Sequence, residues 1–171
     1  TNSGLLRYDG YQFTEFQVLT PEELNTLGSQ DVGSLLIDNQ HNIWAGTWGY
    51  GLSRIDAKTG KLRRFVTDPS DPDSLASMQV QVLFEDKQQN LWVGSTRGIN
   101  RMTADGQWQR LQLSDRQLAH NRIWSLSQTQ DNTLWIGTSA GLHAWREDTG
   151  LSEVMLPFPD GTGRDNEIRA L

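Results

Sequence analysis

Histidine and cysteine carry much of enzyme and metal chemistry, and this chain offers little of either. Its 171 residues include three histidines and no cysteine. His41, His120 and His143 are scattered without the spacing of zinc ligands. The sequence also lacks the short motifs of serine hydrolases, zinc proteases and phosphate-binding loops. We therefore predict that the chain is not an enzyme and that it binds neither a metal ion nor another cofactor.

Aspartates gather in short polar segments, which raises the alternative of a calcium site. Three such segments each precede a tryptophan, at 38–42, 86–90 and 131–133. Asp and Asn commonly form tight turns by bonding their own backbone, and the carboxylates are too few for calcium. Segment 67–78 holds three more aspartates, but its two prolines favour a plain extended connection. We interpret all four segments as connections.

Two aromatic and two basic residues offer binding chemistry instead. Trp48 and Tyr50 are flanked by glycines, so their rings could stack on a flat ligand or a sugar. Arg97 and Arg122 could bind carboxylate or hydroxyl groups. The alternative is that the aromatic residues only cover the ends of strands, as single surface aromatics often do. The predicted ligand-binding residues are Trp48, Tyr50, Arg97 and Arg122.

A repeated pattern identifies the elements that position these residues. Segments 38–52, 86–99 and 131–142 each contain a polar turn, a Trp, a Gly two residues later, and a second Gly before Leu or Ile. The three tryptophans, Trp44, Trp92 and Trp135, lie 48 and 43 residues apart. This period is typical of four-stranded propeller blades. An apolar run precedes each segment and two further strands follow it, which makes four strands per period.

The sequence therefore predicts an all-β fold, a β-propeller. We expect one domain, 1–171, that forms a partial arc of about four consecutive four-stranded blades from a larger, seven-bladed propeller. The expected blade pieces are 4–18, 32–66, 79–112, 122–156 and 167–171. The first and last pieces match only part of a blade, so the flanks of the arc are expected to be exposed.

The glycine of each Trp-x-Gly motif has a predicted packing role. Residues two apart in a strand point to the same face of the sheet. Glycine there removes a side chain that would collide with the neighbouring blade, and the indole fills the space beside it. The loops between second and third strands share a face with the linkers between blades. Trp48, Tyr50, Arg97 and Arg122 are therefore expected on one face.

Composition limits the classes of partner. The chain is 36% hydrophobic and 21% charged, and its net charge is −6. A negative chain without a basic cluster argues against nucleic acid as a partner. No apolar run is long enough to cross a bilayer and no signal peptide is evident. Any membrane attachment is expected only through other parts of a parent chain.

The pattern D-x-x-x-N-[IL]-W-x-G-[TS]-x-x-G-[LI], with the linker DPSDPDSLAS, resembles the two-component regulator propeller repeat family. That resemblance covers nearly the whole chain. It implies the periplasmic sensor region of a bacterial histidine kinase or diguanylate cyclase receptor that binds an unknown small molecule or oligosaccharide. A self-assembling scaffold, in which exposed blade flanks form a homodimer, is a second interpretation. Part of a propeller lyase is a third.

Overall fold

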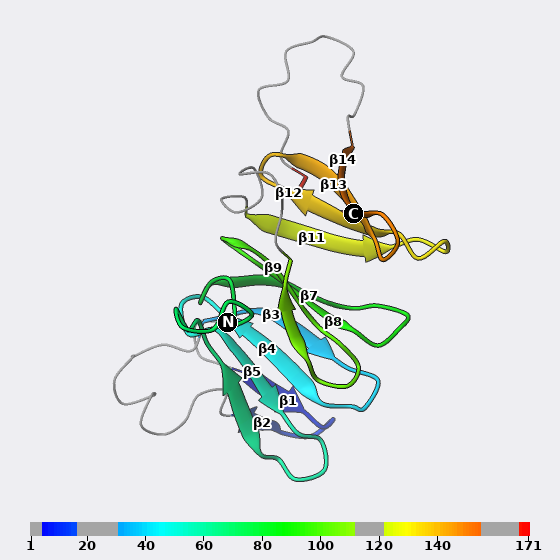
Figure 1. Ribbon diagram of the computed structural model, residues 1–171. Helices are drawn as coiled ribbons and strands as arrows, with labels where there is room; N and C mark the ends of the chain where they lie inside the picture. The colour runs from blue at the N-terminus through cyan, green and yellow to red at the C-terminus, as the bar shows by residue number, and fades with distance from the viewer. Residues whose placement is uncertain (1–4, 17–30, 112–121, 155–167) are drawn as a thin grey trace.

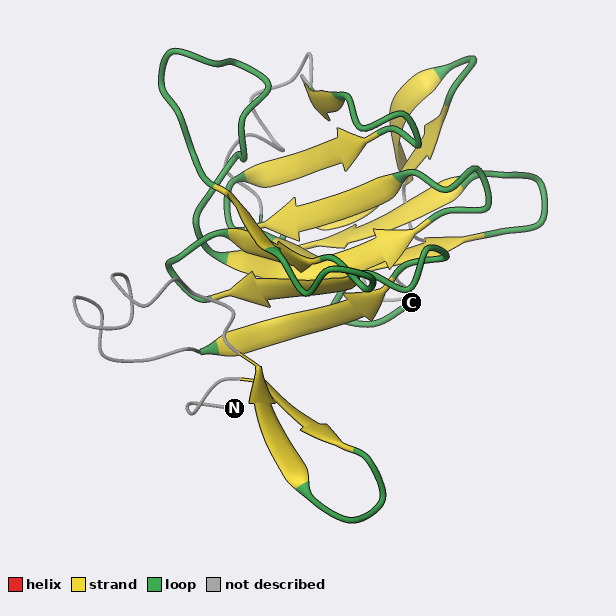
Figure 2. Ribbon diagram, turned by 90° about the horizontal axis from the view of Figure 1, so that it is seen from below, coloured by secondary structure: helices red, strands yellow, loops and turns green. Residues whose placement is uncertain are grey.

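The fold consists of β-strands and the turns that connect them (Figures 1 and 2). The computed structural model describes residues 5–16, 31–111, 122–154 and 168–171. These ranges contain fourteen strands and no helix, and therefore no helix able to span a membrane. The prediction of an all-β fold is confirmed.

The strands form four antiparallel sheets that follow chain order. The hairpin consists of β1 (Leu5–Tyr8) and β2 (Phe13–Phe16). The first four-stranded sheet consists of β3 (Val32–Ile37), β4 (Ile43–Thr47), β5 (Leu52–Ile55) and β6 (Leu62–Phe65). The second consists of β7 (Val80–Glu85), β8 (Leu91–Ser95), β9 (Gly98–Met102) and β10 (Trp108–Arg110). The third consists of β11 (Ile123–Gln128), β12 (Leu134–Thr138), β13 (Gly141–Arg146) and β14 (Gly150–Val154).

The three four-stranded sheets are consecutive blades of a propeller, here called blades 1, 2 and 3. Their first strands, β3, β7 and β11, are the innermost, and β7 contacts both of the others. Figure 1 shows the sheets stacked one after another, with the hairpin β1–β2 beside blade 1. The predicted partial propeller is confirmed. The described residues form three complete blades and a two-stranded hairpin, and the hairpin lies within the first predicted piece, 4–18, which was expected to be only part of a blade.

Each glycine of a Trp-x-Gly motif lies against the next blade. A Cβ built on Gly46 would lie 2.5 Å from Cγ1 of Val80, and a Cβ on Gly94 would lie 2.7 Å from Cγ2 of Ile123. The glycine of the third motif has the same relation to Ile168. Any side chain at these positions would overlap the neighbouring blade, so the role predicted for glycine is confirmed.

The tryptophans of the first two motifs are core residues. Trp44 and Trp92 are 1% and 0% exposed. Trp44 packs in one apolar cluster with Leu83 and Val93 of blade 2, and Trp92 packs in a second cluster that includes Ile136 of blade 3. The architectural interpretation of these indoles is confirmed, because each of them fills the interface between its own blade and the next.

The turn before Trp135 shows that the third segment of the repeat begins at a different residue from the one that the sequence suggested. In blades 1 and 2 the carboxylate six residues before the Trp, Asp38 or Asp86, accepts a 2.8 Å hydrogen bond from indole Nε1. In blade 3 this position belongs to Thr129, whose Oγ1 lies 3.2 Å from Trp135 Nε1. Equivalent backbone bonds close all three turns. The third segment of the repeat therefore begins at Thr129 and not at Asp131, and Asp131 lies inside a turn of the same length as the other two.

The linker 67–78 is folded into turns, so the predicted extended connection is also wrong. The N–H of Asp71 donates to the carbonyl oxygen of Asp68 at 3.1 Å, and the N–H of Ser74 donates to that of Asp71 at 3.2 Å. Leu75 is buried in the core. The guanidinium of Arg110 donates to the carbonyl oxygens of Ser74 and Leu75, both at 2.8 Å. Strand β10 therefore holds the linker on blade 2.

Candidate functional site

The innermost strands carry a bulge at the same place in every blade. The pairing of β3 with β4 passes over Gly33, that of β7 with β8 passes over Gln81, and that of β11 with β12 passes over Trp124. Around Gln81, Val80 packs toward the preceding blade and Val82 packs over the second strand of its own blade. A bulged residue has no ladder partner. On the innermost strand it projects toward the propeller axis.

Trp124 lies between two guanidinium groups at this position. The guanidinium carbon of Arg122 is 4.8 Å from the centroid of the Trp124 ring, and that of Arg169 is 5.3 Å away. Cation–π contacts of this length keep the ring and both charges together. Nε1 of Trp124 and Nε2 of Gln81 are buried and have no hydrogen-bond partner among the described residues. The N–H of Trp124 is thus available beside two positive charges, and Gln81 offers another N–H at the equivalent position of blade 2.

Trp48 completes the arrangement on the side of blade 1. Its backbone N–H donates to the carbonyl oxygen of Asp31 at 3.0 Å, and it forms an isolated bridge with Gln79. A Cβ built on Gly33 would lie 2.0 Å from Trp48 Nε1, so the indole covers the space that the glycine leaves open. Trp48 remains 48% exposed. Oδ1 of Asp31 is buried and bonds no described residue.

We call this set the inner rim. It consists of Asp31, Gly33, Trp48, Gln81, Arg122, Trp124 and Arg169. Its groups are indole rings for stacking, N–H donors, positive charges and one carboxylate. This mixture suits a small polar ligand that has at least one flat face.

Only part of the predicted site lies on the inner rim. Trp48 and Arg122 belong to it. Tyr50 is half-buried and packs instead against an apolar cluster that includes Ala45 and Ile55. Arg97 is exposed in the turn between β8 and β9, where its N–H donates to a hydroxyl oxygen at 3.3 Å. The packing of Tyr50 therefore agrees better with a residue that covers the end of a strand than with a residue that stacks on a ligand.

Sequence reasoning missed the bulged positions. Gln81 and Trp124 lie within apolar runs that predicted strands but gave no sign of a bulge. One signal was available. When the repeats are aligned, these residues take the same place as Gly33 and Arg169. Four different residue types thus replace one another directly after a Val or Ile that recurs in every repeat.

The described residues contain no set of three His, Cys, Asp or Glu side chains placed to hold a metal ion. His120, one of the three histidines, lies outside the described residues. Asp68 and Asp71 of the linker use their carboxylates to accept backbone N–H groups two residues ahead, at 2.8 and 2.9 Å.

Together, the sheets, the bulged inner strands and the packing between blades define part of a β-propeller. Three segments, 26–49, 74–97 and 117–140, match the family described as two component regulator propeller. The chain thus carries three segments that match the repeat of the two-component regulator propeller family. The matched segments all have the same length, in agreement with the equal turns described above. A comparison with curated protein sequences found no match.

Solved structures share the fold. One is described as the extracellular domain of a hybrid two component system from B. thetaiotaomicron, with 24% identity and a TM-score of 0.73 over 94% of this chain. The chain spans only 23% of the length of that structure. A virginiamycin B lyase from Staphylococcus aureus is similar over 75% of this chain and 42% of its own, with 15% identity and a TM-score of 0.59. At these identities the likeness concerns the fold.

Proposed function

We propose that the chain is a periplasmic part of a bacterial signal-transduction receptor, in which it senses a ligand and performs no catalysis. The family whose model matches three segments of the chain supports a role in two-component signalling. The similar extracellular domain supports a place outside the cytoplasm. The output domain, a histidine kinase or a diguanylate cyclase, would belong to another part of the receptor.

The observation that carries the ligand-sensing proposal is the environment of Trp124. Two guanidinium groups contact its ring at 4.8 and 5.3 Å, while its own N–H and that of Gln81 are buried without a described partner. Burying an N–H without an acceptor costs on the order of 1–3 kcal/mol. A ligand that accepts these bonds would recover that free energy. A small oligosaccharide or another polar small molecule has both the acceptors and the flat face required.

A thermal-shift screen with glycans and small polar metabolites tests the proposal. Trp124→Ala and Arg122→Ala are expected to abolish the shift that a hit produces, because both variants remove inner-rim contacts. Arg97→Ala is the matched control, since Arg97 is an exposed arginine outside the inner rim. A shift that survives both rim substitutions in folded protein would exclude the inner rim as the site. A complete absence of hits would argue against sensing of these ligand classes.

The second candidate function is self-assembly, and exposed apolar side chains favour it. On the hairpin β1–β2, Tyr11 is 96% exposed and Phe13 is 71% exposed. On β3, Leu35 and Ile37 are 51% and 64% exposed. Patches of this kind often mark a protein–protein interface. A second copy of the chain, placed on this flank, would cover them in a homodimer, and sedimentation velocity over a range of protein concentrations would detect it.

A further inference from the structure

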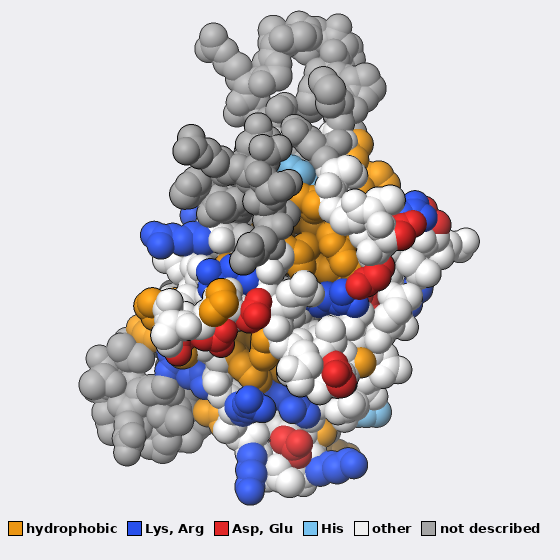
Figure 3. Space-filling model, in the orientation of Figure 1, with side chains coloured by type: hydrophobic (Ala, Val, Ile, Leu, Met, Phe, Trp, Pro, Cys, Tyr) orange, Lys and Arg blue, Asp and Glu red, His pale blue; other side chains and the backbone are white. Residues whose placement is uncertain are grey.

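Two equivalent grooves lie between neighbouring blades, away from the inner rim. The groove between blades 1 and 2 has a volume of about 220 Å³ and the groove between blades 2 and 3 has a volume of about 310 Å³. Both lie among the turns before the tryptophans and the turns between third and fourth strands. Figure 3 shows apolar surface between the sheets on this face, with basic and acidic side chains beside it.

The groove between blades 2 and 3 supplies its arginine with a carboxylate from the next blade. Arg101 of β9 pairs with the carboxylate of Glu147 from blade 3 at 2.8 Å, and its side chain is only 12% exposed. The guanidinium also lies 5.5 Å from the ring centroid of Trp92 and 5.1 Å from that of Trp145. A largely buried guanidinium beside two indoles is thus paired with a carboxylate from the next blade.

The groove between blades 1 and 2 has the same arginine but lacks that carboxylate. Arg54 pairs with Trp44 in the ladder as Arg101 pairs with Trp92. The turns after β9 and β13 have the same register, so Ala104 takes the place of Glu147. The ion pair of Arg54 is with Asp56 of its own blade, at 4.0 Å. Nε of Arg54 is buried without a hydrogen-bond partner among the described residues, as is Nε of Arg101, so the contrast between the two grooves lies in the carboxylate from the next blade.

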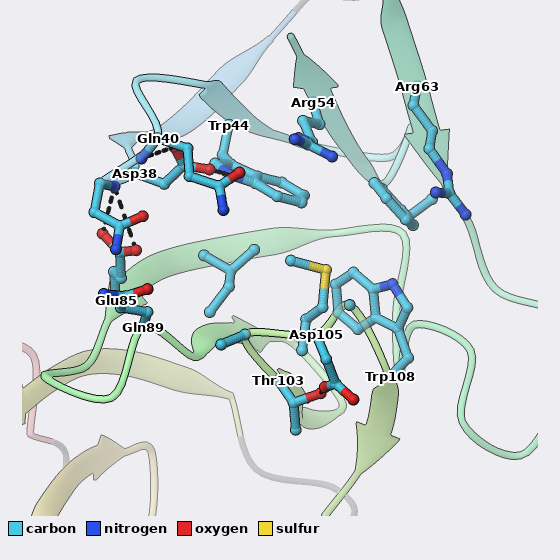
Figure 4. A pocket seen from close by; sticks show the side chains of 16 residues that line it. Asp38, Gln40, Trp44, Arg54, Arg63, Glu85, Gln89, Thr103, Asp105 and Trp108 are labelled. Carbon is cyan, nitrogen blue, oxygen red and sulfur yellow. Dashed lines mark hydrogen bonds between the residues drawn. The ribbon is translucent and has the colours of Figure 1, made fainter. Parts of the chain in front are cut away.

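A second guanidinium and an aromatic wall lie beside Arg54. Arg63 lies over the ring of Phe65, 4.9 Å from its centroid. The ring centroids of Phe65 and Trp108 are 5.1 Å apart, and both rings line the cavity. Figure 4 shows Arg54 and Arg63 on one side of the cavity, with Trp108 facing them from the other. One end of this groove therefore combines two positive charges with apolar rings.

The carboxylates that line the same cavity are already engaged. Asp38 accepts from the Trp44 indole and from its own turn. Glu85 accepts from a backbone N–H of blade 1, and Asp105 accepts from the hydroxyl of Thr103. Figure 4 shows Asp38 and Glu85 at the end of the cavity away from Arg63. These carboxylates therefore leave the arginine end without the partner that Glu147 supplies in the neighbouring groove.

We propose that the groove between blades 1 and 2 binds the carboxylate of a small organic acid with a flat, apolar body. The carboxylate takes the place that Glu147 occupies in the other groove and accepts hydrogen bonds from Arg54, with Arg63 beside it. The body lies along Phe65 and Trp108. Charge-assisted bonds from guanidinium to carboxylate supply the specificity, and the rings supply contact area. This site is independent of the inner rim and of the ligand proposed there.

Isothermal titration with sodium benzoate, compared with its neutral isostere benzamide, tests the proposal. Benzoate is expected to bind the wild-type chain at least about tenfold more tightly than benzamide, the scale of one charge-assisted hydrogen bond. Ala104→Glu should abolish benzoate binding, because it places the chain's own carboxylate beside Arg54. Ala104→Gln is the matched control of similar size without charge, and it should retain binding.

Arg54→Gln provides an independent variant if Ala104→Glu does not fold, and it should weaken benzoate binding about tenfold. Arg122→Ala should leave benzoate binding unchanged, which separates this site from the inner rim. The proposal is overturned if benzoate does not bind, if benzamide binds equally well, or if folded Ala104→Glu and Arg54→Gln both bind benzoate like the wild type.

Discussion

The folded protein disfavours the ionised form of the Glu85 carboxylate. Both of its carboxylate oxygens accept from the N–H of Asn39 in blade 1, at 3.0 and 3.3 Å. Burial raises the pKa of Glu85 above its ordinary value, and the nearby negative charges of Asp38 and Asp86 add to this effect. The equivalent residue in blade 3 is neutral, since Gln128 Oε1 accepts from the N–H of Lys87 at 2.9 Å. The contact between blades therefore needs an acceptor and not a charge.

Glu85→Gln is expected to increase the free energy of unfolding at pH 7 by up to about 1 kcal/mol. A raised pKa means that the folded state holds its proton more tightly than the unfolded state. The wild type therefore loses stability as the pH rises from the unfolded pKa through the higher folded pKa. Urea denaturation of both proteins between pH 4 and 7 measures the difference. It should shrink toward the acidic end, and a variant less stable than wild type at pH 7 would contradict the argument.

Asp131 shows the opposite behaviour. Hydrogen bonds from the hydroxyls of Thr129 and Thr133 lower its pKa to about 2, with smaller contributions from the backbone of Thr133 and the charge of Arg146. A lowered pKa adds stability above the unfolded pKa, which is lost as the pH falls through about 2. Asp131→Asn should therefore be less stable than wild type at pH 7, and the difference should shrink as the pH falls toward 2 and disappear below it. A constant difference in urea midpoint across this range would show that the charge has no part.

At the scale of the strand, close contact between blades depends on glycine. A Cβ on Gly94 would lie 2.6 Å from Val82 Cγ1 and 2.7 Å from Ile123 Cγ2, at the centre of the interface between blades 2 and 3. Gly94→Ala should lower the free energy of unfolding by about 1–3 kcal/mol, the usual cost of overpacking. Gly106→Ala is the control, because Gly106 has open space around it and only a positive φ of 87° to strain. Equal losses in the two variants would show that crowding does not matter.

The strands of the blades could be predicted from sequence because their signals are local. Trp, Gly and apolar runs recur with a fixed spacing, and each strand is fixed by its own few residues. The bulges at Gln81 and Trp124 could not be predicted, because a bulge is defined by the pairing of two strands. The prediction of an extended linker at 67–78 was wrong for a similar reason. Its turns depend on contacts with Arg110 of β10, which lies 36 residues after Ser74.

The same distinction applies to the candidate site. Trp48 stood out because an aromatic ring next to glycine can stack on a flat ligand, and the structure places it on the inner rim. Arg169 and Trp124 are 45 residues apart in the sequence and meet only because equivalent positions of successive blades face the same axis. A site formed between repeats becomes visible when the repeats are aligned and the variable position is identified.

For the whole molecule, the described contacts run from each blade to its neighbour, as in other repeat proteins, whose stability is approximately a sum of such interfaces. Blade 1 contacts blade 2, and blade 2 contacts blade 3. Leu83 of β7 is 9% exposed because it packs against blade 1. Its equivalent in blade 1 is Leu35, which is 51% exposed on the flank where the hairpin β1–β2 lies. Leucine thus occupies the same repeat position in both blades, covered by a neighbouring blade at Leu83 and half-exposed at Leu35.

Substitutions of Leu83 and Leu35 can distinguish an effect on folding from an effect on dimerisation. Leu83→Ala should lower the free energy of unfolding by about 2–5 kcal/mol, because it leaves a cavity between two blades. Leu35→Ala should change the unfolding of the monomer by less than about 1 kcal/mol, because the side chain is already half in solvent. If a second copy covers the flank, Leu35→Ala should instead weaken dimerisation, measured by sedimentation at several concentrations. A dimer whose dissociation constant is unchanged by Leu35→Ala would place the interface elsewhere, and a wild-type monomer at every concentration would exclude self-assembly through this flank.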